Sequence, residues 1–420
     1  MAHRVVVVGA GFGGLPCVRR LRGGPVEVTL VDRRNYHLFT PLLYQVASCL
    51  LNPSEIAAPL RKVLHGAPDV RFRLGEVTGV DLGERLVHLA DGAALPYDDL
   101  VLSIGSTTNY FGNDAIASRA LGLKDLGEAL RLRNHVLRVL ERAATTSDPD
   151  ARRALLTFCI VGGGPTGVEY AGALAELVRL VLPREYPELD RGEVRIVLLE
   201  GADRVLSMFP ASLSAYAARQ LRRMGVDVRL DRLVASATES SVTTRDGEVI
   251  PTETFVWTAG VEPSPLAAGF GLPLDARGRV EVDEHLRVRG VPHVYAIGDV
   301  AAARDRRGGE LPMVSPPAMQ AGRYVARAIL AGIDGRPTRR FRYVDKGTLA
   351  TIGRQSAVGT VGRLRFRGFV GWVVWLAVHL WYLIGFENRV RVLLRWAWYY
   401  VRLDRPVRAI IRSAPDHSAR

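Results

Sequence analysis

Two glycine-rich runs, VVVVGAGFGG and FCIVGGGPTG, are the residues of this sequence best suited to chemistry. Both have the spacing G-x-G-x-x-G between a strand-like run and a helix-like one, the context in which this motif binds a dinucleotide. The first glycine permits a tight turn, the second lets the pyrophosphate approach the backbone, and the third lets the helix pack closely. These glycines are Gly9, Gly11 and Gly14 in the first run and Gly162, Gly164 and Gly167 in the second. Two dinucleotides held by one chain indicate electron transfer between them.

An acidic residue follows each fingerprint at the end of the next strand-like run. Asp32 ends VEVTLVD and Glu200 ends VRIVLLE, positions from which a carboxylate can accept hydrogen bonds from ribose hydroxyls. Because a carboxylate repels a 2′-phosphate, Glu200 favours NADH over NADPH at the second fingerprint. Arg204 lies close by in the sequence and leaves NADPH open as the alternative.

The elements around the fingerprints predict an α/β fold with two Rossmann-like dinucleotide-binding domains. The run HVYAIGDVA brings a strand to Gly298 and Asp299, which would complete a flavin site begun at Gly9. We therefore expect a discontinuous FAD-binding domain, an inserted NADH-binding domain and a C-terminal segment for membrane association. The predicted ranges are 1–115 with 280–345 for the FAD-binding domain, 150–275 for the NADH-binding domain and 346–420 for the C-terminal segment.

The C-terminal segment differs in composition from the rest of the chain. The net charge is +13, and from Arg363 onward eleven arginines stand against three carboxylates. Within this basic segment, GFVGWVVWLAVHLWYLIGF (Gly368–Phe386) has His379 as its only side chain that could carry a charge near neutral pH. Such charge suits nucleic acid or an anionic membrane. The apolar run beside it favours the membrane and argues against nucleic acid.

Gly368–Phe386 is barely long enough to span a bilayer. Arginines both precede and follow it, which the positive-inside bias disfavours for a span. We therefore expect monotopic attachment on the cytoplasmic face of the cell membrane, with arginines at the headgroups and tryptophans at the acyl boundary. The buried interface of a homodimer is the alternative use of these apolar side chains.

The cysteines and histidines indicate neither a metal site nor a dithiol relay. Cys17, Cys49 and Cys159 form no C-x-x-C pair and no zinc spacing. The nine histidines are scattered without metal spacing. The first strand begins almost at Met1, so we expect no signal or transit peptide and a cytoplasmic body.

Together these residues resemble the type II NADH dehydrogenases, the single-subunit, non-proton-pumping NADH:quinone oxidoreductases of respiratory membranes. The resemblance covers nearly the whole chain, and NYHLFTPLLYQVA is a block specific to that family. Further matching runs are IGSTTNYFG, VGGGPTGVEYAGALAEL, VWTAGV, AIGDVA, DKGTLATIGR and VHLWYLIGFENRVRVLLRWAWYY. The family implies non-covalent FAD in the first nucleotide domain, NADH in the second, and a quinone that reaches the flavin from the membrane side.

The resemblance also implies catalytic roles for three side chains. Glu169, in the first turn of the second fingerprint helix, would contact the nicotinamide or supply a proton; otherwise it is a carboxylate at a helix start. Lys346 would place a cation near the flavin ring. Gln320 would line the quinone pocket; otherwise it caps or packs its helix. The family's other glutamine is replaced by Pro316, which has no donor, so the quinone's identity and affinity stay open.

Position within the family's motifs places further residues at the two ligands. For NADH the added residue is Gly260, in VWTAGV. For FAD they are Arg33, Thr40, Pro41, Gly105, Gly298 and Asp299.

Two other functions stay open. One is a related flavoprotein reductase with another acceptor, of the sulfide:quinone or ferredoxin/rubredoxin type. Sulfide chemistry needs paired reactive cysteines, and soluble carriers need no apolar tail, so both features disfavour this alternative. The other is a membrane-docked redox sensor that binds FAD and NADH without quinone turnover, which Pro316 favours.

Overall fold

The computed structural model describes residues 2–402, 405 and 407–410. The chain divides into two compact units. Unit 1 comprises Met1–Leu38, Ala57–Thr108 and Val261–Lys346, and unit 2 comprises Phe39–Ile56, Asn109–Gly260 and Gly347–Arg420. Each unit contains one of the two fingerprints.

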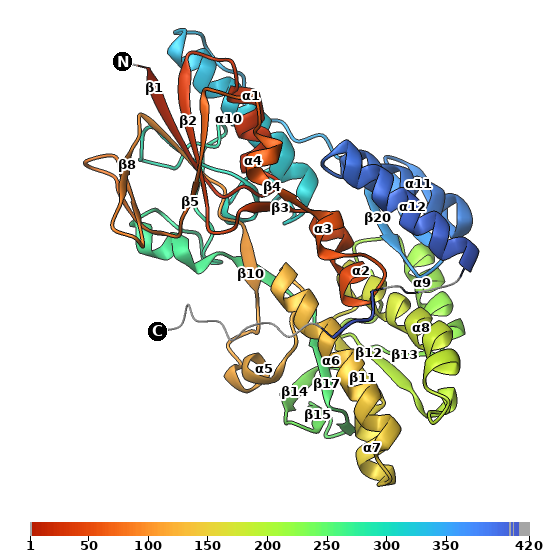
Figure 1. Ribbon diagram of the computed structural model, residues 1–420. Helices are drawn as coiled ribbons and strands as arrows, with labels where there is room; N and C mark the ends of the chain where they lie inside the picture. Colours follow the sequence, from red (N-terminus) through yellow and green to blue (C-terminus); the bar gives the residue numbers. More distant parts are fainter. Residues whose placement is uncertain (1, 403–404, 406, 411–420) are drawn as a thin grey trace. The chain divides into compact units, whose positions relative to one another are not determined.

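Unit 1 is built on a parallel sheet in the order β19-β9-β1-β2-β5. Its strands are β1 (His3–Val8), β2 (Val26–Asp32), β5 (Val70–Leu74), β9 (Asp99–Leu102) and β19 (Val294–Ala296). The central strand β1 contains four buried valines, as parallel strands covered by helices require. Helices α1 (Gly14–Leu21) and α10 (Ser315–Ile333) pack against each other and lie side by side in Figure 1. Because all five strands are parallel, their carboxyl ends share one edge of the sheet.

Smaller elements complete unit 1. Three antiparallel groups are β6 (Val77–Asp81) with β7 (Leu86–Leu89) and β8 (Ala94–Pro96), β3 (Tyr36–Leu38) with β4 (Ala57–Pro59), and β10 (Ser106–Thr108) with β18 (Val261–Pro263). The short helices are α4 (Leu60–Val63), η3 (Pro265–Phe270) and η4 (Gly298–Val300).

Unit 2 repeats the pattern with a parallel sheet in the order β13-β12-β11-β17. Its strands are β11 (Thr157–Val161), β12 (Arg195–Leu199), β13 (Val226–Arg229) and β17 (Thr254–Trp257). The associated helices are α5 (Asp114–Arg119), α6 (Leu126–Thr145), α7 (Pro149–Leu155), α8 (Pro165–Glu185), α9 (Ala211–Arg223) and η2 (Arg191–Glu193). An antiparallel group contains β14 (Val234–Ala237), β15 (Ser241–Thr244) and β16 (Val249–Pro251). The predicted α/β fold with two Rossmann-like sheets is confirmed.

The C-terminal part of unit 2 is a small sheet followed by two helices, drawn in blue in Figure 1. The sheet contains β20 (Thr348–Thr351), β21 (Ala357–Val361) and β22 (Leu364–Arg367), and the helices are α11 (Gly368–Tyr382) and α12 (Phe386–Arg402). Short helices η1 (Thr40–Leu42), α2 (Leu43–Ala47) and α3 (Pro53–Ile56) also belong to this unit. The apolar run is interrupted before Phe386, where Gly385 has φ +90°. Among the described residues, no helix combines the length and the apolar character needed to cross a membrane.

Candidate functional site

The turn from β1 to α1 is the first predicted phosphate loop, and two of its glycines shape it. Gly9 has φ +98°, and a Cβ there would overlap the carbonyl oxygen of Ser103. A Cβ on Gly14 would overlap the carbonyl oxygen of Gly9. A Cβ on Gly11, by contrast, would meet no heavy atom within 4 Å. The first and third glycines therefore permit the turn and its packing, whereas the second faces open space in which a pyrophosphate fits.

The turn from β11 to α8 repeats this arrangement in unit 2. Gly162 has φ +106°, and a Cβ there would lie 2.7 Å from the backbone of Ala259. A Cβ on Gly167 would overlap the carbonyl oxygen of Gly162, while one on Gly164 would again meet no heavy atom within 4 Å. Helix α8 begins directly after this open glycine, so its unpaired amides are available to an anion.

Asp32 and Glu200 hold the two loops through backbone amides. Asp32 accepts from Ala10 N at 2.6 Å and from Arg34 N at 2.8 Å. Burial raises the pKa of Asp32, and these two bonds oppose the rise. Glu200 accepts from Gly163 N at 2.5 Å and from Ala202 N at 2.7 Å. The sequence predicted that these carboxylates face ribose hydroxyls, and the structure adds that their oxygens position the loops.

Two residues of unit 1 that the sequence analysis did not single out also support its loop. His37 Nδ1 donates to the carbonyl oxygen of Ala10 at 2.7 Å, and burial lowers the pKa of His37 to about 4. Gly322, in the middle of α10, lies so close to Gly13 that a Cβ would overlap the Gly13 carbonyl oxygen. A histidine inside an apolar run and a glycine inside a helix are the sequence signals for these roles.

The remaining predicted FAD residues of unit 1 gather at the carboxyl edge of its sheet. Gly105 follows β9 with φ +70°, and Gly298 follows β19 with φ +75°. Asp299 accepts a hydrogen bond from the Ser106 hydroxyl at 2.5 Å. Arg33 is exposed directly after β2. The edge therefore collects the chain segments expected around a dinucleotide.

Three other predicted ligand-binding residues lie in unit 2. Thr40 and Pro41 begin η1. Gly260 follows β17, where its carbonyl oxygen accepts from Asn109 N at 3.2 Å. A Cβ on Gly260 would lie 3.1 Å from the ring of Phe111, so this turn is closely packed.

Glu169 is a buried carboxyl group in the first two turns of α8, with 8% of its surface exposed. It accepts from Thr351 N at 3.2 Å. Burial raises the pKa of Glu169 to about 8, and the Thr351 amide and the Trp375 side chain oppose the rise. The carboxyl group is therefore largely protonated at neutral pH and can store a proton beside the second phosphate loop.

Both the nitrogen and the oxygen of the Gln320 side-chain amide form hydrogen bonds with the main chain of Val344. Its Nε2 donates to the Val344 carbonyl oxygen at 2.9 Å, and its Oε1 accepts from Val344 N at 3.0 Å. It thereby holds the segment that leads to the exposed Lys346. Pro316 lies in the first turn of α10, where a missing N–H costs no helical hydrogen bond.

All three cysteines are buried and free. Burial raises the pKa of Cys17 and of Cys159 to about 12 and that of Cys49 to about 11. Thiols of this kind are poor nucleophiles. The described residues contain no group of three or more His, Cys, Asp and Glu side chains that could hold a metal ion.

Residues 3–322 match the family model of the pyridine nucleotide-disulphide oxidoreductases. The chain is 40% identical over 408 residues to "Type II NADH:quinone oxidoreductase Ndh" of Mycobacterium tuberculosis, covering 94% of this chain and 87% of that protein. It is 38% identical to "Type II NADH:quinone oxidoreductase NdhA" of the same organism, covering 94% and 86%. Among solved structures, NDH2 from Plasmodium falciparum in complex with NADH superposes with a TM-score of 0.90 at 19% identity, covering 98% of this chain and all of that one.

Proposed function

The chain belongs to the type II NADH:quinone oxidoreductases, within the pyridine nucleotide-disulphide oxidoreductase family, and transfers electrons from NADH to quinone; we propose that it does so through non-covalently bound FAD, without pumping protons. The family expected from the sequence motifs is thus confirmed. The observation that carries the FAD proposal is the pair of phosphate loops, each with its middle glycine facing open space. Two such loops fit two dinucleotides.

We assign FAD to unit 1 and NADH to the sheet of unit 2. The residues of unit 1 fit a resident dinucleotide because the open Gly11, Asp32 and the glycines that follow β9 and β19 share one sheet edge. When bound there, the flavin supplies the two-electron chemistry between NADH and quinone. In unit 2, Gly164 and the start of α8 would bind the NADH pyrophosphate, and Glu200 would select against a 2′-phosphate.

Three side chains would then serve the reaction around these ligands. Glu169 holds a proton at its carboxyl group near neutral pH because burial raises its pKa to about 8. Lys346 supplies a positive charge that stabilises negative charge on a reduced ring. Gln320 orients the segment that carries Lys346, because both ends of its amide bind Val344.

Helices α11 and α12 support monotopic attachment to the cytoplasmic face of the cell membrane. Large apolar side chains on them are exposed, among them Trp381 (71%), Phe386 (81%) and Leu394 (63%). Exposed apolar surface of this kind marks an interaction site, and arginines accompany it along the segment. A lipid-soluble quinone and cytoplasmic NADH would both be accessible from this position. A homodimer that buries the same side chains is the alternative.

Steady-state NADH oxidation with different acceptors tests the proposed function. We expect purified protein to be yellow, to release FAD on denaturation, and to oxidise NADH rapidly only when a quinone is present. Faster reduction of ferredoxin by NADH, or faster reduction of quinone by sulfide than by NADH, would contradict the assignment. Bound FAD and NADH without quinone reduction would instead support the sensor.

Vesicle flotation tests the membrane attachment. Trp381→Ser combined with Phe386→Ser should reduce binding to phosphatidylglycerol-containing vesicles while NADH still reduces the flavin. Met208→Ser is the matched control, because Met208 is 57% exposed but lies outside the two helices. Unchanged flotation, together with loss of a dimer in sedimentation, would favour the homodimer alternative.

A further inference from the structure

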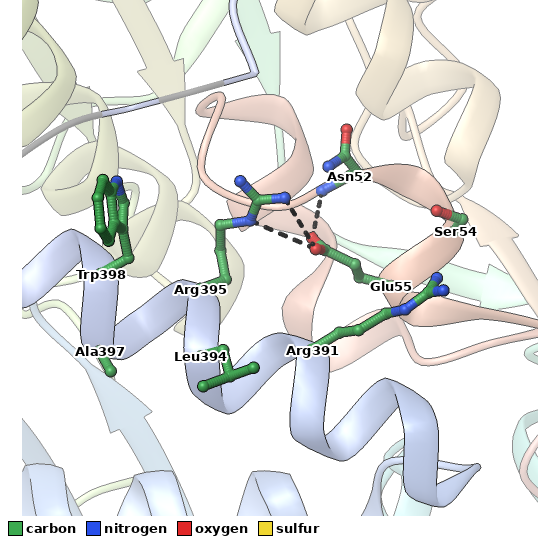
Figure 2. Close-up of a pocket in the computed structure, with 8 residues that line it drawn as sticks. All are labelled: Asn52, Ser54, Glu55, Arg391, Leu394, Arg395, Ala397 and Trp398. Carbon is green, nitrogen blue, oxygen red and sulfur yellow. Dashed lines mark hydrogen bonds and ion pairs between the residues drawn. The ribbon is translucent and has the colours of Figure 1, made fainter.

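A groove of about 680 Å³ runs between α12 and residues 52–55 of unit 2. This volume lies within the range of small-molecule sites in proteins. One side is apolar and comes from α12, where Leu394, Ala397 and Trp398 line it. Figure 2 shows these side chains on the same helix as two arginines that reach toward the facing segment.

The opposite side of the groove carries a buried carboxylate. Glu55 accepts from Asn52 N at 2.6 Å, and its other oxygen lies 3.3 Å from Arg395 Nη2 (Figure 2). Only 6% of the Glu55 side chain is exposed. The carboxylate therefore fixes one arginine in the groove while remaining itself almost inaccessible to a ligand.

The charged side chains that reach the open groove are those of two arginines, whereas Glu55 is buried behind one of them. Arg391 is 54% exposed at the rim, where it also pairs with Glu387. The side chains of Asn52 and Ser54 line the groove beside it. The lining residues thus carry two guanidinium groups and one carboxylate, and Glu387, outside the lining, pairs with Arg391 at the rim. Guanidinium groups recognise phosphate oxygens well.

We propose that this groove binds one glycerophospholipid, its anionic phosphodiester at Arg391 and Arg395 and one acyl chain along Leu394 and Trp398. The chemistry of the groove selects this occupant. A free phosphate would leave the apolar side uncovered, and a quinone could accept hydrogen bonds from the arginines but has no negative charge to pair with them. A phospholipid uses both. The proposal rests on the membrane attachment proposed above, which brings the groove to its ligand, and it adds a specific lipid site to that attachment.

Titration calorimetry with monomeric dihexanoylphosphatidylglycerol tests the site on the full-length protein without a membrane. Arg391→Gln should weaken binding roughly tenfold, because a charge-assisted hydrogen bond is lost. Leu394→Glu should weaken it at least as much by placing a negative charge on the apolar side. The matched controls are Arg365→Gln and Leu393→Glu, exposed positions of the same segment that do not line the groove. We expect both controls to bind as the wild type does.

Competition between ligands and the Trp381→Ser, Phe386→Ser variant distinguish the remaining outcomes. We expect glycerol 3-phosphate and inorganic phosphate to bind at least tenfold more weakly than the lipid, and a short-chain quinone not to displace it. Equal affinity for inorganic phosphate would reduce the groove to an anion site, and displacement by quinone would assign it to that substrate; either result overturns the proposal, as does undetectable lipid binding. The Trp381→Ser, Phe386→Ser variant should still bind the monomeric lipid, so failure of membrane attachment and failure of the lipid site are distinguishable.

Discussion

The two predicted phosphate loops differ in the hydrogen bond that supports the residue after their first glycine. In each loop the residue after the first glycine, Ala10 in unit 1 and Gly163 in unit 2, donates its amide to the following acidic residue. The carbonyl oxygen of Ala10 accepts from the imidazole of His37, whereas that of Gly163 accepts from the backbone amide of Leu206 at 2.7 Å. One loop therefore depends on a buried side chain, and the other depends on the main chain.

The loops also differ in what covers them. The residue before the third glycine is Gly13 in unit 1, and Gly322 of α10 packs so closely on it that a Cβ on Gly322 would overlap the Gly13 carbonyl oxygen. The equivalent residue in unit 2 is Thr166, which is exposed. A loop closed in by a helix suits a resident cofactor, and an open loop suits a ligand that must leave after each turnover. This difference agrees with the assignment of FAD to unit 1 and NADH to unit 2.

Valine substitutions at Gly11 and Gly164 should give the largest effects on ligand binding and could contradict this comparison. Gly11→Val should lower FAD affinity by roughly 100-fold, about 2.7 kcal/mol, because the side chain fills the pyrophosphate space. Gly164→Val should leave the flavin in place and weaken NADH by a similar factor. Neither new Cβ meets a protein atom within 4 Å, so thermal unfolding of the flavin-free proteins should change little. Full flavin occupancy in Gly11→Val would contradict the assignment of unit 1.

A second contrast lies two residues beyond the third glycine, where α1 has Pro16 and α8 has the buried Glu169. Glu169→Gln keeps the shape but cannot release a proton, so quinone reduction should slow by about 100-fold while FAD content stays normal. The wild type should lose activity as pH rises through about 8, where Glu169 loses its proton. Glu185→Gln, at the exposed end of the same helix, is the control. An unchanged rate and pH profile in Glu169→Gln would assign this acid a structural role.

The same residue makes a stability prediction with a defined sign. The pKa of Glu169 is raised from 4.5 to about 8, so the folded state binds more protons between these values. Its contribution to stability is fully present below pH 4.5 and is lost as pH rises through 8. Chemical denaturation across this range should show wild type losing stability relative to Glu169→Gln. Parallel curves would show that the carboxyl group titrates normally.

Replacing Glu200 or Asp32 with its amide should have a smaller effect on nucleotide binding and would sharpen the comparison. Glu200→Gln removes the repulsion of a 2′-phosphate, so the ratio of kcat/KM for NADH to that for NADPH should narrow by about tenfold. It also removes one acceptor of the two loop amides, so both nucleotides should bind more weakly. The ratio is therefore the informative quantity. Asp32→Asn is the matched control in unit 1 and should lower FAD content without changing the ratio.

Much of this arrangement could be predicted from the sequence because it depends on local rules. The glycine spacing after a strand-like run predicted the positions of the two loops. The ends of the next strands predicted the positions of Asp32 and Glu200. The partners of Gln320 could not be predicted, because Val344 lies 24 residues away and meets it only after α10 has packed. Nor does spacing reveal that Glu169 is buried, since helix position alone predicts a solvated carboxylate. The interruption of the apolar run Gly368–Phe386 depends on backbone conformations that spacing does not specify, an extended Leu383 after the end of α11 and Gly385 with φ +90°.

The smallest and most selective effect is expected from His37, whose imidazole supports the loop of unit 1. The pKa of His37 is lowered from 6.5 to about 4, so the folded state binds fewer protons in this range. Its stabilising contribution is fully present above pH 6.5 and is lost as pH falls through 4, when charging the buried ring becomes unavoidable. FAD release from wild type should therefore accelerate several-fold on acidification toward pH 4, while NADH binding, whose loop uses the Leu206 amide, should show no equivalent step. His37→Leu should release FAD faster even at neutral pH, with its acid-dependent step diminished. Identical acid sensitivity in wild type and variant would show that other groups control cofactor release.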